Sequence, residues 1–175
     1  DYVLEIGPGT GNLTWYLAKR AAKVLSVEID PRLVAVLEEQ GLPSNVTVIE
    51  KDFLKLTDDE VREHLCGRIY VAGNLPYYIT TPICVKLMLY GLDIVSFTVM
   101  MQKEVENHFT AREGTKLYAP QTVLTRLYYD VERITNVSRT AFNPEPEVDS
   151  VVLRFTAKQG TGEKGDLYKF LRASI

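Results

Sequence analysis

The chain contains few of the residues that build metal sites or disulfide frameworks. Among 175 residues there are two cysteines and two histidines, and their spacing matches no metal-ligand motif. Cys66 and Cys84 both stand in apolar surroundings. We therefore expect buried, reduced thiols in a cytoplasmic protein, and no metal.

Long apolar runs are also missing. No stretch approaches the roughly 18–20 apolar residues that a membrane-spanning helix needs, and the first residues do not resemble a signal peptide. Apolar residues make up 46% of the chain and charged residues 25%, as in ordinary globular proteins. A chain of this length can build one domain with a normal core, and no membrane partner is expected.

A basic excess is absent too. The net charge is −3 and the isoelectric point is near 5.5, which weighs against a generic phosphate-binding surface. The chain starts inside an apolar run at Tyr2 and stops in the first turns of an amphipathic helix, residues 167–175. We expect a sequence truncated at both ends, with basic segments beyond them.

What the sequence does contain is an alternation of strand-like and helix-like segments. Apolar strands are expected at 2–6, 24–28, 46–49, 68–72 and 94–101. A helix is expected at 13–22. A second should follow the Asp30 cap, with Leu33, Val36 and Leu37 as its apolar face, and a third should follow a Thr81 cap. This alternation predicts an α/β fold with a mostly parallel sheet.

The last third of the chain follows a different pattern. A helix is expected at 121–127, and two strands at 129–135 and 148–155 have no helix between them. They indicate an antiparallel pair at the sheet edge. A glycine-rich linker at 159–165 leads into the terminal helix. We expect one domain at 1–157, followed at 158–175 by the linker and the start of a helical domain.

A glycine turn joins the first strand to the first helix. Gly7, Gly9 and Gly11 occupy a strand–loop–helix junction, a location that favours a nucleotide ligand. A dinucleotide fingerprint would place its third glycine at position 12, which is Asn12. Gly11 instead fits the methyltransferase variant, whose ligand has no pyrophosphate; a plain tight turn is the alternative.

Acidic residues end the next two strands. Glu28 can accept hydrogen bonds from both hydroxyls of a ribose. Asp52 can accept from the amino group of a cofactor adenine, with Phe53 beside the ring. For Glu28, a solvated acid at a strand end is the alternative.

The segment Asn74-Leu75-Pro76-Tyr77 suits the exocyclic amine of a flat heterocycle. The amide oxygen of Asn74 and the carbonyl oxygen of Leu75 can each accept one N–H, and Tyr77 can stack on the ring. Together with the upstream glycine turn, this segment predicts methyl transfer from S-adenosylmethionine to the amino group of a nucleobase.

Five motifs in order give the chain a family resemblance. It resembles the ribosomal RNA adenine N6,N6-dimethyltransferases, whose fold is a Rossmann-like class I S-adenosylmethionine-dependent methyltransferase. The matching segments are Leu4–Gly9, Val27–Asp30, Gly73–Tyr77, Gln102–Val105 and Ala141–Ser150.

The resemblance implies a cofactor, a substrate and a set of site residues. S-adenosyl-L-methionine would be the cofactor, and small-subunit ribosomal RNA the partner, with a monomeric cytoplasmic enzyme acting in ribosome biogenesis. The cofactor would be bound by residues of the glycine turn and the strand ends: Glu5, Gly7, Gly9, Gly11, Glu28, Ile29, Asp52, Phe53 and Asn74. The target adenine would be held by Asn74, Leu75, Pro76, Tyr77 and Phe142.

The chain also departs from the family pattern. Tyr78 stands where an asparagine is usual, and residues 119–121 replace a common glycine-arginine-leucine. A basic motif before the first strand and a helical domain after the linker are both missing. From this we expect a form that binds cofactor but methylates RNA poorly.

Three other functions remain open from the sequence. A methyltransferase acting on DNA adenine or protein glutamine uses a related segment, but Leu75 replaces its first proline. A non-catalytic relative that binds RNA or the transcription machinery is disfavoured by the intact glycine turn. The large-subunit, antibiotic-resistance type is disfavoured by the 102–105 and 141–146 segments.

Overall fold

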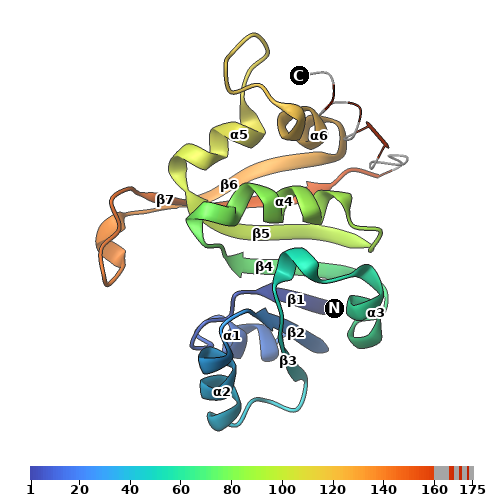
Figure 1. Cartoon of the computed structure of the whole chain (residues 1–175), viewed down its shortest axis with the longest axis vertical. Helices are drawn as coiled ribbons and strands as arrows, with labels where there is room; N and C mark the ends of the chain where they lie inside the picture. The colour runs from blue at the N-terminus through green and yellow to red at the C-terminus, as the bar shows by residue number, and fades with distance from the viewer. Residues whose placement is uncertain (160–165, 168–169, 171–172, 174–175) are drawn as a thin grey trace. The chain divides into compact units, whose positions relative to one another are not determined.

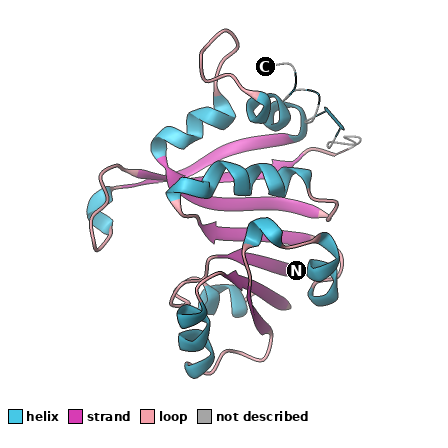
Figure 2. Cartoon of the chain, viewed as in Figure 1, coloured by secondary structure: helices cyan, strands magenta, loops and turns pink. Residues whose placement is uncertain are grey.

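The computed structural model describes residues 1–159, 166–167, 170 and 173. The expected linker at 159–165 and the terminal helix at 167–175 lie almost entirely outside the described residues. The fold is α/β, and the seven strands within these residues form a sheet of order β3-β2-β1-β4-β5-β7-β6 (Figures 1 and 2).

The strands agree closely with the sequence prediction. They are β1 (Tyr2–Ile6), β2 (Lys23–Glu28), β3 (Val46–Glu50), β4 (Ile69–Asn74), β5 (Ile94–Gln102), β6 (Tyr129–Val137) and β7 (Ser150–Ala157). The α-helices are α1 (Thr14–Ala18), α2 (Pro31–Glu39), α3 (Asp58–His64), α4 (Thr80–Leu89), α5 (Asn107–Thr110) and α6 (Pro120–Tyr128). Short 3-10 helices are η1 (Phe53–Lys55), η2 (Tyr77–Ile79), η3 (Lys103–Glu106) and η4 (Arg139–Ala141).

The chain divides into two compact units. Unit 1 comprises Asp1–Leu75 and Tyr90–Phe97, and unit 2 comprises Pro76–Leu89 and Thr98–Ile175. Each is described by itself below.

Unit 1 is built on parallel strands in register. Strand β1 pairs in parallel with β2 and β4, and β2 pairs in parallel with β3. Ile6 lies opposite both Val27 and Gly73, while Glu28 lies opposite Glu50. The carboxyl ends of all four strands therefore reach the same edge of the sheet, which is where ligands bind in open α/β sheets.

Helix α2 begins as predicted, but its buried face differs. The side chain of Asp30 accepts a hydrogen bond from the backbone N–H of Arg32 and caps the helix. Val34 and Leu37 are buried, whereas Val36, expected on the apolar face, is 37% exposed. Leu33, Val34 and Leu37 share one stripe of a 3.6-residue helix, and Val36 lies on the exposed side of that stripe.

Two helix boundaries were predicted wrongly. Helix α1 ends at Ala18 rather than residue 22, because Ala22 donates its N–H to the carbonyl of Asp1 and so belongs to the approach to β2. Helix α4 starts at Thr80 rather than after a Thr81 cap, because η2 leads directly into it.

Helix α3 was not predicted. It begins with a capping box in which Thr57 and Glu60 exchange side-chain and backbone hydrogen bonds. This Thr-x-x-Glu pattern is a recognised start signal, but the helix has seven residues and a single buried side chain, Val61. Its apolar periodicity is too short to stand out.

Unit 2 contains the expected antiparallel pair. Strands β6 and β7 pair antiparallel, with a register irregularity between Arg133 and Thr135. The rings of Phe109 and Phe155 pack edge to face, with centroids 5.3 Å apart. Cys84 is buried as expected, whereas Cys66 in unit 1 is exposed, so the prediction of two buried thiols is wrong for Cys66.

Candidate functional site

The glycine turn after β1 presents open backbone. Gly7 donates its N–H to the carbonyl of Val27 at 3.0 Å, which ties the start of the turn to β2. Gly9 has a φ of +59°, and no atom lies within 4 Å of the point where a Cβ would stand. A ligand can therefore approach the backbone at Gly9 closely.

Gly11 has a packing role. Its φ is +89°, and a Cβ there would lie 2.7 Å from Cδ2 of Leu37 and 3.3 Å from the indole nitrogen of Trp15. A glycine is thus needed to let the turn pack against α2. The predicted contact of Gly11 with a cofactor stays a prediction.

The carboxylate of Glu28 is fixed beside the turn. One oxygen accepts from the backbone N–H groups of Ile29 at 2.8 Å and Asp30 at 3.0 Å, and the other accepts from Gly9 at 3.2 Å. The residue is 6% exposed. A carboxylate offers about four lone-pair sites, so one acceptor position remains on the oxygen that faces Gly9.

Glu5 is the other buried acid of this region, at 1% exposure. Its Oε2 accepts hydrogen bonds from Ser26 at 2.6 Å and Thr14 at 2.8 Å. Its Oε1 has no hydrogen-bond partner in the described part of the chain. Burial raises the pKa of Glu5, and the two hydroxyl donors oppose that rise. A buried acceptor without a partner calls for a donor from outside the chain.

Asp52 and Phe53 follow β3. The backbone N–H of Lys51 donates to the carbonyl of Glu28 at 2.8 Å, so the segment that follows β3 continues alongside the end of β2. Asp52 caps η1 by accepting from Leu54 at 2.9 Å. Phe53 is 5% exposed and packs edge to face on Tyr90, with centroids 6.0 Å apart. Their predicted contacts with a cofactor stay predictions.

The end of β4 meets the glycine turn. A Cβ on Gly73 would lie 2.8 Å from the carbonyl oxygen of Ile6, so β1 and β4 approach closely there. The carbonyl oxygen of Asn74 lies 3.7 Å from the position of a Cβ on Gly7. The side chain of Asn74 is exposed and has no hydrogen bond among the described residues, whereas that of Leu75 is 1% exposed.

Unit 1 thus brings most of the predicted cofactor residues together. Glu5, Gly7, Gly9, Glu28 and Asn74 lie at the carboxyl ends of β1, β2 and β4, and Asp52 follows the neighbouring end of β3. Sequence reasoning missed Thr14 and Ser26, which orient Glu5. The only sequence signal for Ser26 is a hydroxyl within an otherwise apolar strand.

Unit 2 contains Tyr77 and Phe142, the two residues expected to stack on the target base. The hydroxyl of Tyr77 lies 3.1 Å from Oγ of Ser150, the first residue of β7. The carbonyl of Pro76 accepts from Oγ1 of Thr80 at 3.0 Å, which anchors the start of η2. Phe142 follows η4, which Ser138 caps through the N–H of Thr140. Ser150 ends the last family motif, Ala141–Ser150, but the motif does not predict its hydrogen bond with Tyr77.

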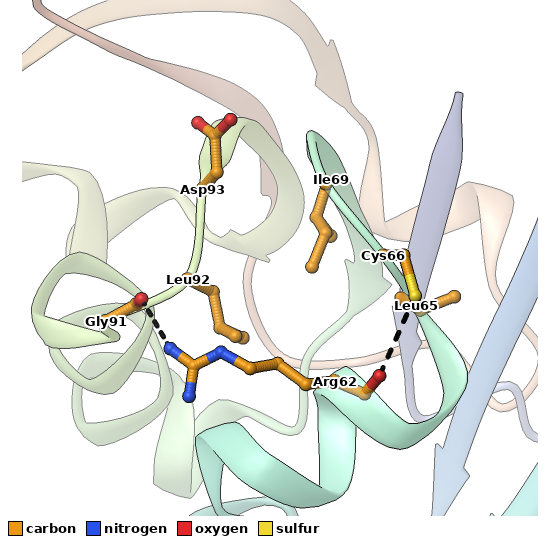
Figure 3. Close-up of a pocket in the computed structure, with 8 residues that line it drawn as sticks. Arg62, Leu65, Cys66, Ile69, Gly91, Leu92 and Asp93 are labelled. Atoms are coloured by element: carbon orange, nitrogen blue, oxygen red, sulfur yellow. Dashed lines mark hydrogen bonds between the residues drawn. The ribbon is translucent and has the colours of Figure 1, made fainter.

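Unit 1 also contains a hollow at the opposite ends of the strands (Figure 3). It lies near Ile69 and Asp93, at the starts of β4 and β5. The guanidinium of Arg62 beside it is already engaged, donating to the carbonyl of Gly91 at 2.8 Å and to Asp59 at 3.0 Å. The Arg62 guanidinium therefore holds neighbouring segments of the protein together and does not face a ligand, so we do not consider this hollow a candidate active site.

The described residues contain neither a metal-binding cluster nor a helix that could span a membrane. No group of three or more His, Cys, Asp or Glu side chains there could hold a metal ion. None of the helices there is long and apolar enough to cross a membrane.

Comparison with known proteins identifies relatives of the whole chain. The family model described as ribosomal RNA adenine dimethylase matches residues 1–173. A ribosomal RNA small subunit methyltransferase A from Staphylococcus carnosus is 46% identical over 181 aligned positions, covering 99% of this chain and 61% of the relative. One from Bacillus mycoides is 48% identical, covering 86% of this chain and 53% of the relative. The chain spans between half and two thirds of the length of these relatives.

Solved structures agree with this assignment. A dimethyladenosine transferase from Plasmodium falciparum superposes with a TM-score of 0.83 at 31% identity, covering 98% of this chain and 62% of that one. The 23S rRNA methyltransferase ErmE superposes with a TM-score of 0.76 at 33% identity, covering 98% and 67%. These matches establish the class I methyltransferase fold, and the chain belongs to the ribosomal RNA adenine dimethylase family.

Proposed function

We propose that this protein is an S-adenosylmethionine-dependent enzyme that dimethylates the N6 amine of adenine in small-subunit ribosomal RNA. The observation that carries the proposal is the pair of buried carboxylates, Glu5 and Glu28, beside the open backbone of Gly9. Both acids retain acceptor capacity that no described residue uses.

The residues of unit 1 fit S-adenosylmethionine by their chemistry. A ribose presents two hydroxyl donors, and Glu28 has an acceptor position next to Gly9. The methionine part of the cofactor carries an ammonium group, and the unpaired Oε1 of Glu5 suits a cation or an N–H donor. Asp52 would accept from the adenine amine. When bound, the cofactor supplies a methyl group activated on a sulfonium, so no metal is needed for the transfer.

The residues after β4 suit the nucleophile. The N6 lone pair of adenine is delocalised into the ring and must be localised before it can attack a methyl group. The amide oxygen of Asn74 and the carbonyl oxygen of Leu75 would accept the two N–H bonds, favouring a pyramidal nitrogen. This is catalysis by positioning and polarisation rather than by a strong base.

The aromatic residues of unit 2 suit the ring. Tyr77 and Phe142 would stack on the adenine, an interaction worth about 1–3 kcal/mol per base. The target base must leave its helix, or be unpaired already, to reach such residues. The second methylation requires only that the monomethylated amine be admitted.

The choice of small-subunit RNA follows from the relatives. The curated relatives at 46% and 48% identity are named small subunit methyltransferases, whereas the 23S enzyme ErmE is 33% identical. We therefore propose a role in ribosome biogenesis, with precursor small subunits as partner. The proposal also takes the enzyme to be cytoplasmic and monomeric. The curated relatives favour small-subunit RNA over the large-subunit alternative, and the available acceptors of Glu5 and Glu28 favour an enzyme over a non-catalytic relative.

The test is incubation of the full-length protein, rather than of these 175 residues alone, with unmethylated small-subunit RNA and S-adenosylmethionine labelled in its methyl group. Mass spectrometry of the digested RNA should find labelled N6,N6-dimethyladenosine. Large-subunit RNA in a parallel reaction serves as the control for RNA class. Label only in large-subunit RNA would overturn the choice of substrate, and cofactor binding without label in either RNA would overturn the enzymatic proposal.

A further inference from the structure

Tyr78 is the most exposed large apolar or aromatic side chain that the structure describes, at 82%. It forms no hydrogen bond, ion pair or ring contact with any of the described residues. A single exposed aromatic side chain on a protein surface is ordinary. The position of Tyr78 sets it apart, because it directly follows Tyr77, the residue expected to stack on the target base.

The backbone that carries Tyr78 is fixed on both sides. The hydroxyl of Tyr77 before it lies 3.1 Å from Oγ of Ser150. The carbonyl of Pro76 accepts a hydrogen bond at 3.0 Å from Oγ1 of Thr80, which is fully buried. Tyr78 lies between these two bonds, in η2. Its ring is therefore exposed on an ordered turn and not on a loose loop.

The geometry of η2 separates the two tyrosine rings. A 3-10 helix has three residues per turn, so successive side chains leave its axis about 120° apart. Tyr77 is half-buried and its hydroxyl is bonded to the first residue of β7, whereas Tyr78 is exposed. The two rings therefore face different directions and are suited to two different bases.

The sequence around Tyr78 favours stacking over charge as the means of contact. Residues 75–85 contain no Asp or Glu, although the whole chain has 23 acidic residues. No carboxylate of this segment therefore repels a phosphate backbone. The same segment contains no Lys or Arg, so it offers a nucleic acid a ring face and no cation. Tyrosine has few rotatable bonds, and ordering its ring on a ligand costs little entropy.

Base flipping creates a ligand for such a ring. When a target base leaves its stack, the base beside it loses a stacking partner. Aromatic side chains take the place of that partner in proteins that bind single strands, and they do so with little dependence on which base is present. An exposed ring next to the target residue can thus stabilise the RNA in its flipped form.

We propose that Tyr78 stacks on the base next to the target adenosine and holds the RNA strand open while Tyr77 holds the target itself. The inference rests on the proposed function, because it takes RNA containing the target adenosine as the ligand. It makes Tyr78 a substrate-binding residue that contacts the face of the neighbouring base and tolerates any base there.

The experiment measures binding of short RNAs to the full-length protein by fluorescence anisotropy. The probes are fluorescein-labelled uridine heptamers with a central adenosine, in which the nucleotide on its 5′ side or on its 3′ side is either purine riboside or an abasic ribose. Purine riboside has a ring to stack but no exocyclic amine or carbonyl. On one of the two sides, the abasic RNA should bind on the order of tenfold more weakly than the purine RNA.

The variants separate the ring from the rest of the residue. Tyr78→Asn introduces the residue usual at this position in the family, and it should reduce the purine-to-abasic ratio to about twofold or less. Tyr78→Phe keeps the ring and should retain the full ratio. Tyr16→Ala is the matched control, because Tyr16 is a tyrosine of similar exposure, 70%, on α1 of unit 1; it too should retain the full ratio.

Four outcomes would each overturn the inference. They are equal affinity for the purine and abasic RNAs, a ratio that survives in Tyr78→Asn, loss of the ratio in Tyr78→Phe or Tyr16→Ala, and no binding up to millimolar RNA. Methyl transfer to small-subunit RNA is assayed separately. Transfer without dependence on the neighbouring base removes this inference alone, whereas dependence on that base without transfer removes the proposed function.

Discussion

The hydroxyl of Tyr77 lies 3.1 Å from Oγ of Ser150, although 73 positions separate the two residues. Ser150 is fully buried at the start of β7, and Tyr77 begins η2. The bond fixes the tyrosine against a strand, so its ring direction is set by the core of unit 2 rather than by its own short helix.

Removing this hydrogen bond should lower stability more than it impairs base stacking. Tyr77→Phe should reduce the free energy of unfolding by about 0.5–1.5 kcal/mol, the net value of one hydrogen bond, while retaining the ring. A double-mutant cycle with Ser150→Ala, followed by urea unfolding, measures the pair directly. Additive effects would show that the bond contributes nothing in solution. Tyr77→Ala should in addition weaken binding of adenosine-containing RNA.

Loss of the Glu28 carboxylate should weaken cofactor binding. Glu28→Ala should reduce the affinity for S-adenosylmethionine by about 1.5–3 kcal/mol, the range for hydrogen bonds to a charged group. Calorimetry measures the affinity for S-adenosylmethionine. The temperature must be one at which the variant is folded, because the N–H groups of Gly9, Ile29 and Asp30 also lose their hydrogen-bond acceptor. Glu50→Ala, an exposed acid in register with Glu28, is the control. Unchanged affinity in Glu28→Ala would rule out the assignment.

Asn74→Ala should impair turnover more than cofactor affinity. The amide oxygen is expected to act on the adenine amine as it attacks, so its loss raises the barrier without removing a main cofactor contact. Single-turnover rates at saturating cofactor and RNA give the first quantity, and calorimetry the second. A fall in cofactor affinity with an unchanged rate would make Asn74 a binding residue only.

The buried Glu5 should make stability depend on pH in the direction opposite to most carboxylates. Burial raises its pKa in the folded protein above the ordinary value of 4.5. Between these two pKa values the folded state binds more protons than the unfolded state. Stability from this group is therefore full below pH 4.5 and is lost as the pH rises through the folded pKa.

The variant Glu5→Gln removes that titration. Its stability relative to the wild type should rise as the pH increases from about 4.5 to 8, measured by urea unfolding of the cofactor-free protein. Its affinity for S-adenosylmethionine should fall, because a neutral amide replaces the carboxylate that is proposed to bind the ammonium group of the cofactor. A stability difference that is constant across this pH range would contradict the raised pKa.

A side chain at Gly11 should strain the packing of the glycine turn against α2. Gly11→Ala places a Cβ 2.7 Å from Leu37 at a φ of +89°, and overpacking of this kind costs about 1–3 kcal/mol. Gly41→Ala is the matched control, because its φ is +70° with no atom within 4 Å. It carries the backbone cost of about 1–2 kcal/mol for a left-handed alanine without the clash. Equal losses of stability in both variants would show that the Leu37 side chain moves aside without cost, and would contradict the predicted clash.

Much of the fold could be predicted because its signals are local. Apolar runs placed the strands to within a few residues, and Asp30 before Pro31 located the start of α2 as the structure has it. The antiparallel β6–β7 pair followed from two strands with no helix between them. The short helix α3 was not predicted, because seven residues offer too little apolar periodicity. Helix α1 was predicted too long, because the end of a helix depends on tertiary hydrogen bonds such as that from Ala22 to Asp1.

The sequence by itself determined the family, the strand-end positions of Glu5, Glu28 and Asn74, and hence the edge of the sheet at which a cofactor would bind. These follow from motif spacing and from the rule that parallel strands end together. Only the tertiary structure decided which hydrogen-bonding groups remain available to a ligand and which are used within the fold. It commits Glu5 Oε2 to Ser26 and Thr14 but leaves Oε1 unpaired, packs Gly11 against Leu37, and joins Tyr77 to Ser150. Such pairings depend on contacts between residues far apart in the chain, which no local pattern of residues encodes.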